Sequence, residues 1–133
     1  MNITLQTNAS DTSLEFRNCR PCDDDAFQCH LSVVSSPFSA EQDFWFERFY
    51  LETAVIALEA LNTSFRGNTK LGLQFEEPFV ALAGDGLGHI AVSGLLVQSG
   101  PRFQRLEWEF QTDQTCLTPL LRDFRNLLSL PIF

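Results

Sequence analysis

The sequence is poor in positive charge, and it has no apolar run long enough to cross a membrane. Nine Lys and Arg residues stand against seventeen Asp and Glu residues, so the net charge is −8. Nucleic-acid binding normally needs a basic face, which this balance argues against. A membrane-spanning helix needs roughly 20 apolar residues, and the first ten residues lack the basic segment and apolar run of a signal peptide. We therefore expect a cytoplasmic protein that binds neither nucleic acid nor membrane.

The sequence also lacks a cysteine and histidine pattern suited to a metal site. Cys19 and Cys22 form one C-x-x-C pair, but a structural zinc site usually has two such pairs. Cys29 and His30 are adjacent, and neighbouring side chains on a strand point to opposite faces of a sheet. Cys116 is remote from the others. We expect reduced thiols, no metal and no other cofactor.

Apolar residues, by contrast, are abundant. They make up 44% of the chain and include 13 Phe, which is enough to fold without disulfides or metal. A length of 133 residues suits one core, so we expect a single domain over residues 1–133.

Alternation of apolar and polar residues predicts strands in most of the chain. This period of two is typical of strands that bury one face. It occurs over residues 13–19, 27–34, 71–76, 79–83, 89–97 and 105–112, and a shorter strand can form at 3–6. In the last of the long strands, Leu106, Trp108 and Phe110 face one way, while Glu107 and Glu109 face the other.

Two segments predict amphipathic helices. Ser39 is the predicted N-cap of the first, because Gln42 has the spacing of a capping box, and this helix should end near Asn62. Its predicted buried face comprises Phe46, Phe49, Tyr50, Thr53, Ala57 and Leu61. In the second helix, Thr118 is the predicted cap and Pro119 the first helical residue. Its apolar stripe comprises Leu117, Leu120, Leu121, Phe124, Leu127 and Leu128.

These elements together predict an α+β fold, with an antiparallel β-sheet and both amphipathic helices packed on one face of it. Strands with one polar face and short connections form antiparallel sheets. Each helix must bury its apolar stripe, and the apolar side of the sheet is the available partner. The other side of the sheet would then be open to water or to a binding partner.

The stretch GDGLGHIAV at residues 84–92 is predicted to be a turn between two strands. Gly84, Gly86 and Gly88 suit positive φ angles or crowded positions, and Asp85 followed by Gly86 is a strong turn dipeptide. A phosphate-binding glycine loop would need a helix after the glycines, whereas an apolar strand follows here. The acidic ligands and final Glu of an EF-hand loop are also missing.

His89 leaves a catalytic alternative open. It could pair with Asp85 and a nucleophile such as Ser93 or Cys116 in a hydrolytic or small-molecule-binding site. The chain contains neither a G-x-S-x-G nor an S-x-x-K motif, so we expect a protein that is not an enzyme. A structural module that associates with itself is a further alternative, and either a monomer or a homodimer would fit.

Two segments resemble the WapI family of bacterial immunity proteins. The family pattern is a glycine turn of the form G-D-G-x-G-H, then a strand ending in D-Q-T-Y-L before the last helix. This chain has Asp85, Gly86, Gly88 and His89 in the first motif, and Asp113, Gln114, Thr115 and Leu117 in the second. It departs from the pattern at Cys116, where Tyr is favoured. The resemblance covers roughly residues 38–130, and residues before it match no family.

The resemblance implies an immunity protein that binds and neutralises a cognate toxin domain in the cytoplasm. Its acidic balance would favour a basic partner, because opposite charges speed encounter. Candidate contact residues are Glu107 and Glu109 on the open sheet face, Glu76 and Glu77 at a strand end, and Trp45 on the first helix. We expect a structural role for Asp113, Gln114 and Thr115, because the Asp113 carboxylate can accept backbone N–H groups where the last strand becomes a helix.

Overall fold

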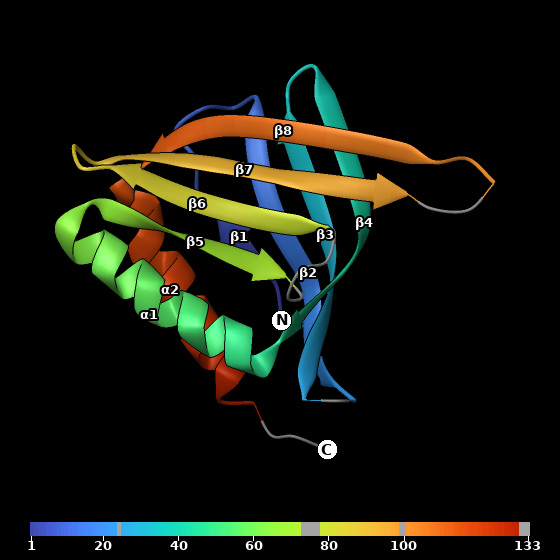
Figure 1. The fold of residues 1–133 in the computed structure, drawn as a ribbon, viewed down its shortest axis with the longest axis horizontal. Coiled ribbons are helices and arrows are strands. Elements are labelled where there is room, and N and C mark those ends of the chain that lie inside the picture. Colours follow the sequence, from blue (N-terminus) through green and yellow to red (C-terminus); the bar gives the residue numbers. More distant parts are fainter. Residues whose placement is uncertain (24, 73–77, 99–100, 131–133) are drawn as a thin grey trace.

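The strands form two four-stranded antiparallel sheets in the computed structural model, which describes residues 1–23, 25–72, 78–98 and 101–130. The first sheet has the order β1 (Ile3–Leu5), β2 (Thr12–Cys22), β3 (Ala26–Ser35) and β4 (Phe38–Glu47). The second has the order β5 (Arg66–Gly72), β6 (Phe79–Asp85), β7 (His89–Gln98) and β8 (Gln104–Asp113). The strands of one sheet cross those of the other (Figure 1). Each strand pairs with its neighbour in the sequence, so both sheets are simple meanders.

The predicted α+β class with antiparallel strands is confirmed, but the strands form two sheets where one was expected. Helix α1 (Arg48–Ser64) connects β4 to β5 and thereby carries the chain from the first sheet to the second. Alternation along a strand shows that one face is buried, but it does not show which sheet the strand joins. That choice depends on the long connection, which local patterning does not describe.

Both helices lie together on one side of the molecule (Figure 1). Helix α2 (Leu117–Leu128) follows a single 3-10 turn, η1 (Gln114–Cys116). The two helices are joined by the ion pair between Glu59 and Arg125 and by a 3.3 Å hydrogen bond from Asn62 to the Thr118 hydroxyl. Helix α1 lies against β5, and α2 lies against β1. No helix in the described ranges combines the length and the apolar character needed to span a membrane.

The predicted start of the first helix at Ser39 is wrong. Residues 38–47 form β4, which pairs with β3 along its whole length, and α1 begins at Arg48. Phe44 and Phe46 are buried, while Trp45 between them is 38% exposed. This alternation, together with a full ladder to β3, outweighs the local signal of the Ser39–Gln42 spacing. The Gln42 side chain instead accepts the backbone N–H of Val97 on β7 at 2.7 Å and so links the two sheets.

The predicted buried face of the first helix is also wrong. The residues of α1 that are buried are Leu51, Ala54, Val55, Leu58 and Leu61. Of the six predicted residues, Phe46 lies in β4 and only Leu61 is buried within the helix; Phe49 is 69% exposed. Apolar residues occur on both sides of this helix, so periodicity alone did not choose between them. The stripe predicted for α2 is confirmed, except that Leu128 is only partly buried.

One hydrophobic core includes residues of both sheets and both helices. At its centre are four fully buried phenylalanines, Phe16, Phe44, Phe46 and Phe124, and the centroids of neighbouring rings lie 5.6 to 6.1 Å apart. These rings meet in tilted or edge-to-face arrangements, which aromatic pairs prefer. Phe124 comes from α2, so the last helix closes the core of the first sheet.

Candidate functional site

The outer side of the second sheet carries both glutamates predicted to contact a partner. Glu107 and Glu109 are exposed on β8, pointing away from the core residues Trp108 and Phe110. Across the sheet, Glu107 lies beside Leu95 of β7, and Leu95 lies beside Phe79 of β6. Glu109 lies in the same way beside Ser93. We call the surface formed by Phe79, Ser93, Leu95, Arg105, Glu107 and Glu109 the second-sheet face.

The second-sheet face is hollowed. Its residues line an open depression of about 520 Å³, to which Gly94 and Trp108 also contribute. Leu95 is buried and Phe79 half-buried, which gives the depression an apolar floor, while Glu107 and Glu109 stand at its acidic side. Lys70 places its Nζ atom 4.1 Å from the centroid of the Phe79 ring, a cation–π contact. An apolar centre with a charged border is the usual composition of a protein-binding surface.

Trp45 lies on a different surface from these glutamates. It is on the outer side of the first sheet, beside Gln28 of β3. Each sheet packs its other side into the shared core, so the structure does not bring Trp45 together with Glu107 and Glu109. Glu76 and Glu77, the remaining predicted contacts, lie outside the described residues.

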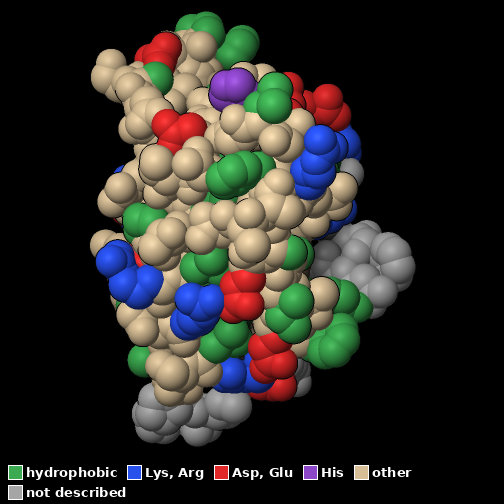
Figure 2. Space-filling model, turned by 90° about the vertical axis from the view of Figure 1, so that its left-hand side faces the viewer, with side chains coloured by type: hydrophobic (Ala, Val, Ile, Leu, Met, Phe, Trp, Pro, Cys, Tyr) green, Lys and Arg blue, Asp and Glu red, His purple; other side chains and the backbone are tan. Residues whose placement is uncertain are grey.

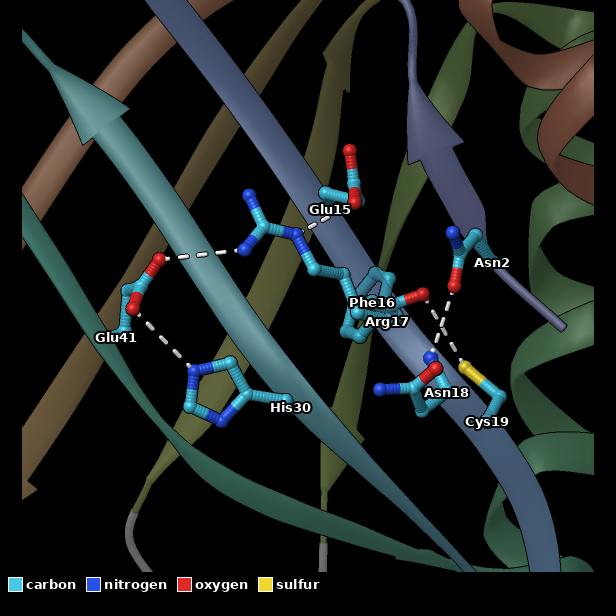
Figure 3. Close-up of polar contacts among 8 residues, drawn as sticks. All are labelled: Asn2, Glu15, Phe16, Arg17, Asn18, Cys19, His30 and Glu41. Atoms are coloured by element: carbon cyan, nitrogen blue, oxygen red, sulfur yellow. Dashed lines mark hydrogen bonds and ion pairs between the residues drawn. The ribbon is translucent and has the colours of Figure 1, made fainter.

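The outer side of the first sheet holds a charged cluster that the sequence analysis missed (Figure 3). Arg17 on β2 lies 2.7 Å from Glu15 and 3.4 Å from Glu41 of β4. His30 on β3 lies 3.4 Å from both Glu41 and Asp43. The alternation in residues 41–45 could have revealed this cluster. That segment was assigned to a helix, so its outward-facing residues were not recognised.

The stretch 84–89 comprises the end of β6, the turn at residues 86–88 and the first residue of β7, and the Asp85 side chain holds it together. The Asp85 carboxylate accepts the backbone N–H of Leu87 at 2.7 Å and that of His89 at 3.2 Å, and it lies 2.7 Å from the His89 Nδ1 atom. These contacts lower the pKa of Asp85, and the hydrogen bond from the Leu87 N–H contributes most. Gly86 and Gly88 have φ angles of +86° and +97°, which favour glycine.

Asp113 occupies the corner where β8 becomes η1. It accepts hydrogen bonds from the Thr115 hydroxyl, from the Asn8 side chain and, at 2.9 Å, from the Thr115 backbone N–H. These three bonds lower the pKa of Asp113. The Gln114 backbone N–H donates to the Gly88 carbonyl at 2.9 Å, and His89 pairs with Asp113 across the strands. The two motifs of the family resemblance therefore meet in one corner of the fold.

The proposed catalytic partners of His89 are not arranged for nucleophilic attack. Ser93 is four residues along the same strand, about 13 Å away at about 3.3 Å per residue. Cys116 is buried, and burial together with the charge of Asp113 raises its pKa to about 12. Its thiol therefore stays protonated near neutral pH, whereas a nucleophilic cysteine needs the thiolate.

The side of the molecule that carries the turn between β6 and β7 has a surface of mixed polarity (Figure 2). Hydrophobic side chains there lie among acidic and basic ones. Within the described ranges, no group of three or more His, Cys, Asp or Glu side chains is placed to hold a metal ion.

Comparison with known proteins finds no relative of this chain. No family model, curated protein or solved structure matches the chain. The resemblance to the WapI immunity family therefore depends on the two motifs alone.

Proposed function

We propose that this protein binds a toxin domain through the second-sheet face and neutralises the toxin by covering the surface that the toxin needs for its activity. The observation that carries the proposal is the position of Glu107 and Glu109 beside the apolar floor formed by Phe79 and Leu95. Apolar residues supply the buried area of an interface, and a charged border steers the encounter. Occlusion requires only surface complementarity, so no catalytic step by this chain is needed.

Two further observations support a basic toxin as the partner. The chain carries a net charge of −8, which attracts a basic surface over a distance of about a Debye length. The two motifs that resemble WapI immunity proteins supply the toxin–immunity context. We further propose that the protein acts in the cytoplasm, where such an immunity protein meets its toxin.

The direct test is binding to a toxin domain encoded beside the gene for this protein. We expect that neighbouring gene to encode a large secreted protein with a toxic C-terminal domain, and this domain to co-purify with the chain. Replacing Glu107 and Glu109 with Lys should lower the association rate about tenfold or more at low salt, because the attraction becomes repulsion.

The matched control replaces Glu41 and Asp43 with Lys on the first sheet, which changes the net charge equally. A larger loss in the Glu107 and Glu109 variant than in this control supports the second-sheet face. Equal rates in the two variants would remove that face from the proposal, and a toxin domain that fails to bind the unmodified chain would remove the function itself.

A further inference from the structure

Helix α1 has a second apolar stripe, on the side that points away from the core. It comprises Phe49, Thr53, Ile56, Ala60 and Thr63, which follow one another at spacings of four, three, four and three residues. This is the spacing by which one helix packs along another in a coiled coil. Phe49 is 69% exposed and Ile56 is 68% exposed. Two large apolar side chains therefore stand one heptad apart in solvent, opposite the buried face of the same helix.

The two threonines of this stripe present little polarity to solvent. The Thr53 hydroxyl donates to the Phe49 carbonyl at 3.0 Å, and the Thr63 hydroxyl donates to the Glu59 carbonyl at 3.0 Å. Each hydroxyl is therefore bonded to its own helix, one turn back. The Thr53 and Thr63 methyl groups remain for contact, so the stripe is apolar over about 20 Å of helix at about 1.5 Å per residue.

The charge beside the stripe is acidic. Glu52 and Glu59 each follow one of the two large apolar residues by three positions, which places them along one flank of the stripe. Glu59 pairs with Arg125 of α2, which partly offsets its charge, so Glu52 contributes most to the acidity of this flank. The one basic residue of α1, Arg48, is already engaged, since it pairs with Asp25 at 2.8 Å and donates to the Leu128 carbonyl at 3.0 Å.

This charge distribution identifies the kind of partner that fits. A second copy of the chain, packed antiparallel along the stripe, would bring the Glu52 side of one helix against the Glu59 side of the other. Like charges at such flanking positions oppose pairing, and each copy carries a net charge of −8. A helix with basic flanking residues meets the same stripe with favourable charge.

We propose that the outer stripe of α1 docks an amphipathic helix of a partner protein, one with aliphatic residues at coiled-coil spacing and Lys or Arg beside them. Helices commonly bind in this way through apolar residues at i, i+4 and i+7. The inference does not depend on the second-sheet face, because the residues of that face lie on strands and the stripe lies on a helix.

The test uses a synthetic 21-residue peptide with Leu at the two core heptad positions and Lys at the two flanking positions. Two control peptides carry Glu in place of Lys, or the same Leu and Lys residues in scrambled order. Binding is measured by fluorescence anisotropy of the labelled peptide, and amide NMR shifts locate the contact. We expect the Leu/Lys peptide to bind more tightly than both controls and to shift the amides of α1.

Variants separate the stripe from general attraction to an acidic protein. Changing both Phe49 and Ile56 to Gln should weaken binding at least about tenfold, as loss of central apolar anchors does. The matched control changes Leu87 and Phe103 to Gln, which are 79% and 63% exposed, and should bind like the unmodified chain. Changing Glu52 and Glu59 to Lys should reverse the preference between the Lys and Glu peptides. Both glutamates at the second-sheet face remain in place in all these variants.

Three results would overturn the inference. The first is equal binding of the scrambled peptide, and the second is an equal loss of affinity in the Leu87 and Phe103 control. The third is a dimer mass by light scattering that becomes monomeric when Phe49 and Ile56 are changed, which would assign the stripe to a second copy. Loss of toxin binding in the Glu107 and Glu109 variant would leave this test unaffected.

Discussion

The two helices of this protein use their apolar residues differently. Helix α2 buries Leu120, Phe124 and Leu127 on one side and exposes Arg122 and Arg125 on the other. Helix α1 has apolar residues on both sides, so one apolar stripe enters the core and another is left in solvent. A helix with a single apolar face reveals its orientation in its sequence, whereas a helix with two such faces does not.

The helices also begin differently. A corner built around Asp113 leads into η1 and α2, and its carboxylate accepts the Thr115 N–H. Helix α1 follows directly from β4 at Glu47, with no side-chain cap. Helix α1 is therefore positioned by the strand that precedes it and by its packing, whereas α2 also has a local signal at its entry.

The largest expected effect on stability follows from removing the Phe124 ring of α2 from the core. Changing Phe124 to Ala should lower the free energy of unfolding by about 3 to 5 kcal/mol, because the ring contacts Phe16 and Phe46 and leaves a cavity. Urea denaturation measures the change. Changing exposed Arg122 to Ala should alter stability by less than about 0.5 kcal/mol. Similar values for the two variants would contradict the division of α2 into a buried and a solvent face.

The next effect concerns the C-terminal end of α1. A side-chain carbon at Gly84 of β6 would approach Leu61 and the Phe65 carbonyl more closely than van der Waals contact allows. We expect Gly84→Ala to lower the free energy of unfolding by about 1 to 3 kcal/mol, the usual effect of overpacking. Ala83→Ser, at the neighbouring exposed position, is the control for urea unfolding. An unchanged midpoint for Gly84→Ala would mean that α1 is not held close to β6.

A smaller, pH-dependent effect on stability is expected at the Asp113 corner, where the chain enters η1 and α2. Bonds from the Thr115 hydroxyl, the Asn8 amide and the Thr115 N–H lower the pKa of Asp113 below its ordinary value of 3.8. The stabilisation from this carboxylate is therefore complete above about pH 4 and lost as the pH falls through the lowered pKa. The melting temperature of Asp113→Asn should fall less between pH 5 and pH 2 than that of the unmodified protein. Asp123→Asn serves as control, and parallel curves for the unmodified protein and Asp113→Asn would refute the role of the corner.

The smallest effect is expected on the outer side of α1. Phe49→Gln should change the free energy of unfolding by less than about 0.5 kcal/mol, because the side chain is already in solvent. Leu58→Gln, on the buried side of the same helix, should cost several times more, since it places an amide in the core. Equal losses would show that Phe49 belongs to the core, and the comparison between the helices would fail.

Sequence patterning predicted the strands well where their period was clear. The strands at 79–83, 89–97 and 105–112 were found, and the turn predicted at 84–88 between the first two lies at 86–88, because β6 continues to Asp85. It also placed Glu107 and Glu109 on the side away from the core. These features depend on neighbouring residues, through the strand period and through turn chemistry. It did not reveal that Trp45 lies on another sheet, nor that His30, Arg17 and Glu41 form a cluster.

The sequence by itself determined the α+β class, the apolar face of α2 and the turn chemistry around Asp85, because each follows from contacts within a few residues. Tertiary structure decided that residues 38–47 join a sheet, since the ladder to β3 satisfies their backbone groups and at the same time places Phe44 and Phe46 in the core. It also decided which side of α1 is buried and how the strands divide into two sheets. Those outcomes depend on partners far away in the chain, which local periodicity does not identify.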